Sequence, residues 1–351
     1  MLKNTVIENL AEPESISAVR SKCLRMRFNR NECAECIAQC RPKAILIDED
    51  IRVNAESCTE CMLCVSACPM DVFELSGSDF YSLVGRLRKV PPSIQSPVLG
   101  CAAKASSTSH VKTSCLGFLS EEHLIALSFF MQNPLQFNFT GCSDCGNGFI
   151  METLGKRISG IEAKTAIRIS DKMRMVTSRA DLDFQEISYD RRGFFKAIKN
   201  MTFAQAAGIF ENEDPEEQPR SYSSKKLPLK RELLNMALKC LITERSQILK
   251  NYYFTVMTTE ACNNCFACIG MCPTGALKIE SAGEKRYLTF SSSLCGGCGL
   301  CRDFCMQHAV QLKKVFSESN PFEFRATTGS SMTSHQKENT MDIAERCCNG
   351  I

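Results

Sequence analysis

Residues 262–273 read CNNCFACIGMCP, and residues 295–305 read CGGCGLCRDFC. Both stretches have the spacing Cys-x-x-Cys-x-x-Cys-x-x-x-Cys. The same spacing recurs far upstream in residues 58–69, CTECMLCVSACP. Cysteines separated by two residues can converge from one tight loop on one metal group. The pattern therefore predicts metal centres at both ends of the chain.

A fourth group of cysteines departs from this spacing. Cys33, Cys36 and Cys40 follow Cys23, and nine residues separate Cys23 from Cys33 where the other groups have two. The longer loop can still deliver a thiolate, because doubling the length of a loop costs only about 0.6 kcal/mol in closure entropy. The four groups form an internal repeat and hold 16 of the 23 cysteines.

The charge balance and the start of the chain limit where the protein works. The 351 residues include 42 basic and 39 acidic side chains, a net charge of +3 that predicts no nucleic-acid partner. Residues 1–15 are interrupted by acidic residues and Pro13, so they do not resemble a signal peptide. The best apolar run, 124–131, is shorter than the roughly 18 residues of a membrane span. We expect a cytoplasmic protein whose thiols are reduced or metal-bound.

The cysteine groups resemble bacterial-type ferredoxins, whose modules bind two [4Fe-4S] clusters each. In that family three cysteines of one loop hold one cluster, and the fourth holds the neighbouring cluster. If Cys23 is not a ligand, the site to which Cys33 and Cys36 belong would be a three-cysteine [3Fe-4S] centre or would take an outside ligand. The resemblance implies four sets: Cys262, Cys265, Cys268 with Cys305; Cys295, Cys298, Cys301 with Cys272; Cys58, Cys61, Cys64 with Cys40; and Cys23, Cys33, Cys36 with Cys68.

Disulfides and four-cysteine zinc sites are the alternatives for these sixteen residues. Zinc commonly uses Cys-x-x-Cys pairs separated by a longer loop. Consecutive Cys-x-x-Cys spacings without such a loop therefore favour an iron-sulfur cluster. Between the last two groups, residues 276–280 and 286–290 predict a β-hairpin. Residues 44–48 and 51–53 repeat it near the N-terminus. The predicted fold class is α+β, with two ferredoxin-like modules, each a βαβ hairpin plus cluster loops, flanking a small α/β domain.

The middle of the chain predicts that α/β domain. Strands are expected at 96–100, 110–113 and 135–140, and helices at 120–131 and 147–158. Alternating strands and helices favour a mostly parallel sheet, whose sites lie at the carboxyl ends of its strands. A cysteine follows the end of each predicted strand within two residues.

These four cysteines, Cys101, Cys115, Cys142 and Cys145, are candidates for a fifth cluster. The region loosely resembles the iron-sulfur delta subunit of methyl-viologen-reducing hydrogenases, which passes electrons to heterodisulfide reductase. That resemblance implies a [2Fe-2S] cluster here, and a [4Fe-4S] cluster is the other possibility. Two alternatives are a Cys142–Cys145 dithiol with a pKa lowered by a helix N-terminus, and plain buried cysteines.

The remaining residues are expected to connect or to follow these modules. Residues 194–209 and 231–249 have helical spacing, with Cys240 expected in a core. The predicted division is 1–77, a module for two [4Fe-4S] clusters; 78–175, the cysteine-containing α/β module; 176–250, a charged linker with helices; 251–315, a second two-cluster module; and 316–351, a polar, disordered tail.

A fully ligated cubane relays electrons but offers no vacant iron to a substrate. The favoured function is therefore electron transfer between a donor and an acceptor protein. We expect a subunit of a larger oxidoreductase such as a hydrogenase, a heterodisulfide reductase or a molybdenum enzyme. The alternatives are a stand-alone reductase that uses the middle cysteines, and a redox or oxygen sensor.

Overall fold

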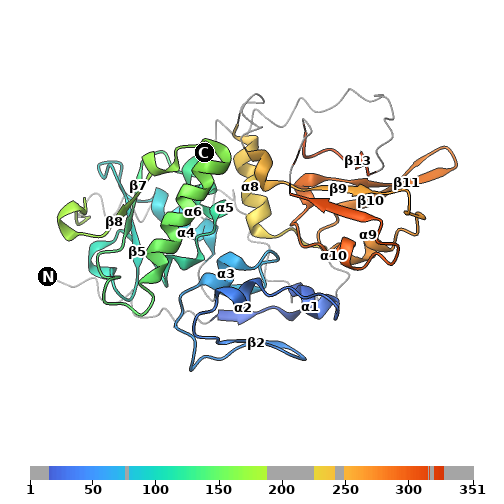
Figure 1. Ribbon diagram of the computed structural model, residues 1–351. Helices are drawn as coiled ribbons and strands as arrows, with labels where there is room; N and C mark the ends of the chain where they lie inside the picture. The colour runs from blue at the N-terminus through green and yellow to red at the C-terminus, as the bar shows by residue number, and fades with distance from the viewer. Residues whose placement is uncertain are drawn as a thin grey trace, which may run out of the picture.

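The computed structural model describes residues 16–75, 79–187, 225–241, 249–314, 316 and 320–327. In Figure 1 the N-terminal segment (blue) lies below helix α8 (Leu229–Lys239), the middle segment lies to one side of α8, and the C-terminal segment (orange) lies to the other. All three meet around this helix. Mixed helices and strands agree with the predicted fold class.

The middle segment contains a four-stranded, wholly parallel sheet in the order β6-β5-β7-β8. The three strands predicted here are confirmed, and the fourth, β8, was missed. Every residue of the sheet's two central strands, β5 and β7, is buried, including the polar Gln136 and Asn138. The strands are β5 (Val98–Cys101), β6 (Val111–Thr113), β7 (Leu135–Asn138) and β8 (Met173–Val176).

Helices α4 (Phe80–Arg88), α5 (Glu121–Phe130) and α6 (Phe149–Thr165) lie between this sheet and α8 (Figure 1). Both predicted helices are confirmed, and α4 was missed. The side chain of Ser120 accepts the N–H of His123, which fixes the start of α5. These helices and α8 share one apolar core.

The N-terminal segment is built from short elements. Its first and last strands pair antiparallel and enclose a hairpin. The order is β1 (Ile16–Ala18), α1 (Leu24–Arg27), α2 (Glu35–Gln39), β2 (Ile45–Ile47), β3 (Ile51–Val53), α3 (Leu63–Ala67) and β4 (Phe73–Leu75).

The C-terminal segment has the same plan. Its outer strands pair antiparallel around the predicted hairpin. The order is β9 (Thr255–Thr258), α9 (Ala267–Met271), β10 (Leu277–Ala282), β11 (Lys285–Phe290), α10 (Leu300–Asp303) and β12 (Val310–Lys313). Each half of each segment thus contributes one cysteine loop and two strands, with one helix between the strands, or two in the first half of the N-terminal segment.

The helical spacing expected at 231–249 is confirmed in part by α8, whose apolar face is buried against α5. Two other predictions outside the modules are wrong. Cys240, expected in a core, is exposed because it lies at the end of α8. The tail is not wholly disordered, since Arg325–Ala326 (β13) pairs with β11. The predicted helix at 194–209 lies outside the described residues.

His123 makes the fold sensitive to acid. It is fully buried, and desolvation lowers the pKa of this imidazole to about 3, with Lys230 and Arg157 adding to the shift. Below pH 6.5 the unfolded chain therefore binds a proton that the folded chain rejects. We expect the free energy of unfolding to fall by about 1.4 kcal/mol per pH unit from this residue as the pH drops from 6.5 toward 3.

His123→Gln tests this, since glutamine at the same position retains a capping box with Ser120. Anaerobic urea unfolding at pH 6.5 and 5.5 should show a smaller loss of stability in the variant than in the wild-type chain. Equal losses would mean that His123 does not carry the acid sensitivity.

Candidate metal centres

The three regularly spaced cysteine loops share a left-handed backbone conformation. In each, the residues on both sides of the second cysteine have left-handed φ angles, which cost a non-glycine residue about 1–2 kcal/mol. Turns of this kind aim successive N–H groups into a concavity that binds anions, including iron-sulfur groups. The angles are 52° and 63° at Glu60 and Met62, 54° and 58° at Asn264 and Phe266, and 74° and 76° at Gly297 and Gly299.

A second backbone feature follows the last cysteine of all four groups. The third residue after it is left-handed at Lys43, Asp71, Gly275 and His308, with φ angles of 55°, 48°, 75° and 49°. In three groups the next N–H donates to the cysteine sulfur, at 3.2 Å for Ala44 to Cys40, 3.4 Å for Val72 to Cys68 and 3.4 Å for Ala309 to Cys305. Hydrogen bonds to cysteine sulfurs are one determinant of cluster potential.

The irregular group keeps part of this geometry. Neither residue between Cys33 and Cys36 has a left-handed φ. The nine residues after Cys23 form α1 and its flanks, and they return the chain to the same place. Cys23, Cys33, Cys36 and Cys68 all line one cavity of about 20 Å³. The structure thus brings Cys23 together with the three cysteines that the resemblance groups with it.

The second N-terminal set is also assembled. Burial raises the pKa of Cys61, and the sulfurs of Cys40 and Cys58 lie near enough to add to the shift. Burial likewise raises the pKa of Cys64 to about 12, with Cys61 and Cys58 contributing. Cys40, the last cysteine of the first group, thus lies beside the loop that contains Cys58 and Cys61.

The C-terminal sets show the same crossing. Burial raises the pKa of Cys268 to about 11, and Cys262, Cys265 and Cys305 are its charged neighbours.

For Cys298, burial raises the pKa to about 12, and its charged neighbours are Cys295 and Cys272. The same two residues and Cys298 contribute to the raised pKa of Cys301. The fourth cysteine of each C-terminal loop thus lies with the other loop.

Buried thiols crowded in this way resist ionisation unless positive charge is placed among them. Iron supplies that charge, so the donor sets fit a thiolate-bound metal group. Within the described ranges no three Cys, His, Asp or Glu side chains converge on one ion position. A cubane binds each thiolate through a different iron, so its ligands do not need to converge on a point.

Cys101, Cys115, Cys142 and Cys145 line one cavity of about 80 Å³. They meet because the sheet is parallel, so β5, β6 and β7 end at the same edge. The next two strands in the chain, β6 and β7, lie on opposite sides of β5, and a reversal of this kind opens a crevice at this edge of the sheet.

The dithiol interpretation predicted a lowered pKa at Cys142, and this is wrong. Burial raises the pKa of Cys142 to about 11, with Cys101 and Cys145 adding to the shift.

The middle cysteines lie directly against the N-terminal segment. Cys61 is one of the charged neighbours of Cys115, and Asn147 Nδ2 donates to the carbonyl oxygen of Thr59 at 2.6 Å. Gly117 packs so closely that an added Cβ would lie 2.0 Å from the carbonyl oxygen of Cys61. The contact therefore depends on the missing side chain at Gly117.

Two family models match the chain. The 4Fe-4S dicluster domain matches residues 261–309, and the 4Fe-4S binding domain matches residues 51–74. These segments are similar to iron-sulfur domains. The first match spans all eight cysteines of the two C-terminal groups, and the second spans Cys58 to Cys68. Neither model reaches residues 78–175.

No curated protein matches the chain. Among the described residues, no helix combines the length and apolarity needed to cross a membrane.

Gly117→Ala should separate the middle segment from the loop of Cys61. We expect a loss of about 1–3 kcal/mol in the free energy of unfolding, since the new methyl group meets backbone. The matched control is Gly85→Ala inside α4, where no atom lies within 4 Å of an added Cβ. It should stabilise the protein by about 0.5–1 kcal/mol. Anaerobic chemical denaturation measures both, and equal effects would contradict the close approach at Gly117.

Proposed function

We propose that this chain relays electrons between redox proteins through four [4Fe-4S] clusters and a fifth cluster at the middle cysteines. When bound, each cluster supplies a one-electron carrier. The proposed ligand sets are Cys101, Cys115, Cys142 and Cys145 (the middle set); Cys40, Cys58, Cys61 and Cys64 (set N1); Cys23, Cys33, Cys36 and Cys68 (set N2); Cys272, Cys295, Cys298 and Cys301 (set C1); and Cys262, Cys265, Cys268 and Cys305 (set C2).

The observation that carries the proposal is that these sets follow one another in a single series. The middle set borders N1 through Cys115 and Cys61. N1 borders N2, since Cys36 is a charged neighbour of Cys64. C1 borders C2, since Cys268 is a charged neighbour of Cys301.

N2 and C1 are joined across the interface of the two terminal segments. Leu300, inside the C1 loop, is completely buried in the N-terminal core. Asn31 donates to the carboxylate of Asp303 at 3.0 Å, and the rings of Phe28 and Phe304 meet edge to face at 5.5 Å. Apolar and polar contacts thus hold the two inner sets beside each other.

The two C-terminal loops differ in the exposure of their cysteines, and we propose different tasks for them. In the C1 loop Cys295 and Cys301 are buried, whereas in the C2 loop Cys265 is exposed. A partner protein can approach C2 directly, so this loop is the proposed contact for one redox partner. We propose that the complete assembly is a larger oxidoreductase in which this chain is the electron-transfer subunit.

Iron and acid-labile sulfide in anaerobically purified protein test the ligand sets. We expect about 16 irons per chain for four cubanes, and about 18 or 20 when the middle set holds a two- or four-iron cluster. Colourless protein with four zinc ions, or with disulfides, would overturn the proposal.

Cys265→Ser and Cys240→Ser form a matched pair of exposed cysteines. Loss of Cys265 should remove between about one and four irons, because C2 loses a ligand. Loss of Cys240 should leave the iron content unchanged. If the two variants retain the same iron, Cys265 is not a ligand.

Electron paramagnetic resonance tests the series. In the fully reduced chain, neighbouring clusters should give spectra split by spin coupling. Cys298→Ser, which changes C1 between its two neighbours N2 and C2, should remove part of that splitting. Uncoupled signals in the wild-type chain would contradict the proposed order.

A further inference from the structure

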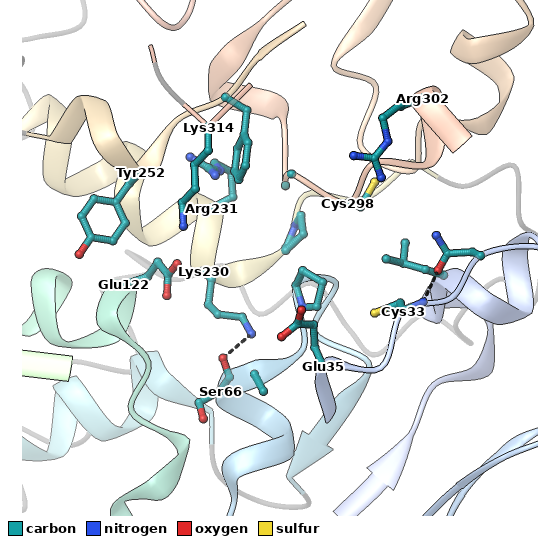
Figure 2. A pocket seen from close by; sticks show the side chains of 18 of the residues that line it. Cys33, Glu35, Ser66, Glu122, Lys230, Arg231, Tyr252, Cys298, Arg302 and Lys314 are labelled. Atoms are coloured by element: carbon teal, nitrogen blue, oxygen red, sulfur yellow. Dashed lines mark hydrogen bonds between the residues drawn. The ribbon is translucent and has the colours of Figure 1, made fainter. Parts of the chain in front are cut away.

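A cleft of about 860 Å³ lies between the terminal segments, and its walls include Cys33 of N2 and Cys298 of C1. The first turn of α8 reaches into its side. In Figure 2, Lys230 points toward Ser66 of the N-terminal segment, whereas Arg231 extends the other way, beside Lys314 of the C-terminal segment. Two consecutive residues thus point to different modules.

Lys230 is a buried cation held against N2. Only 7% of the surface of Lys230 is exposed. The ammonium group donates to the carbonyl oxygens of Val65 at 3.0 Å and Ser66 at 3.2 Å, and to that of Cys68. Asp71 pairs with it at 3.0 Å and offsets part of its charge. Every partner comes from the turn that carries Cys68.

Arg231 is a buried cation beside C1. It is 6% exposed, and its Nε and Nη1 atoms have no hydrogen-bond partner among the described residues. The guanidinium lies 4.8 Å from the ring of Tyr253 and 5.6 Å from that of Phe254. Phe254 in turn packs on Gly297, inside the C1 loop.

Both cations also interact electrostatically with cysteine sulfurs of the set that each one lies beside. The positive charge of Arg231 opposes the burial that raises the pKa of Cys295, and Lys230 does the same for Cys68. A buried arginine with free donors costs stability unless a negative group faces it. The anionic cluster that the C1 thiolates would hold is such a group.

We propose that Lys230 and Arg231 set the reduction potentials of the two inner clusters, Lys230 that of N2 and Arg231 that of C1. The proposal rests on the function proposed above. Reduction adds one negative charge to a cluster, and a fixed cation in a low-dielectric site stabilises that charge. Each residue therefore raises the potential of its own cluster. The inner clusters hold electrons more strongly than they would without α8.

Redox titrations of the full, cluster-loaded chain test this, with electron paramagnetic resonance as the readout. Arg231→Gln should lower the reduction potential of one cluster by at least about 59 mV. For a one-electron couple this is a tenfold decrease in the equilibrium constant for reduction. Arg231→Lys should restore most of the shift because it keeps the charge. Lys230→Gln should lower the potential of a different cluster. The control is Lys239→Gln, which removes the same charge from the exposed end of α8 and should change no potential.

Asp71→Asn supplies a test of opposite sign that keeps the buried cations in place. Asn tolerates the left-handed backbone at this position. Removing the carboxylate leaves Lys230 uncompensated, so the N2 potential should rise. This arm decides the Lys230 half if the Lys230 variant fails to fold. If Arg231→Gln loads no cluster, Arg231→Lys decides the Arg231 half: it should keep nearly the wild-type potential, and a C1 potential lowered by about 59 mV or more despite the retained charge would overturn that half.

The outcomes separate the two proposals. A chain without the expected iron and sulfide refutes the proposed function before any potential is measured. A chain that holds its clusters, and whose potentials in Arg231→Gln and Lys230→Gln equal those of Lys239→Gln, refutes only the role of the two cations.

Discussion

The crossing of the fourth cysteine constrains both terminal segments. In each, the last cysteine of one loop lies with the sulfurs of the other loop, so neither half completes a set alone. The apolar cores are small and include the cysteines themselves, with Cys268, Cys272, Cys295 and Cys301 among the buried residues of the C-terminal core. Cores of this size rarely stabilise a fold unaided. Metal binding in these segments would therefore contribute to folding as well as to redox chemistry.

The structure brings near one another the cysteines that the resemblance to ferredoxins groups into sets. The four middle cysteines also lie together, as the strand pattern suggested, because parallel strands bring their carboxyl ends to one edge. The left-handed residues were not predictable in the same way. Glu60 and Phe266 carry no compositional sign of a positive φ, and only the convergence of the cysteines around them requires it.

The helical spacing of α8 was predicted, but its packing against the modules was not. The residues upstream of it are polar and charged, and they suggested a linker. Its place in the core depends on contacts with α5 and with both terminal segments, which no local pattern encodes. The same holds for Arg325–Ala326, a two-residue strand that exists only because the edge of β11 is available.

The left-handed residue three positions after each last cysteine is a lysine, an aspartate, a glycine or a histidine. Four unrelated side chains in one backbone conformation are the outcome expected when a gene segment encoding a cysteine loop, a helix and its two flanking strands is duplicated, and the product duplicated again. In such a lineage the chain geometry outlasts the identity of the residues that adopt it. The irregular Cys23 group is then the copy that has diverged furthest.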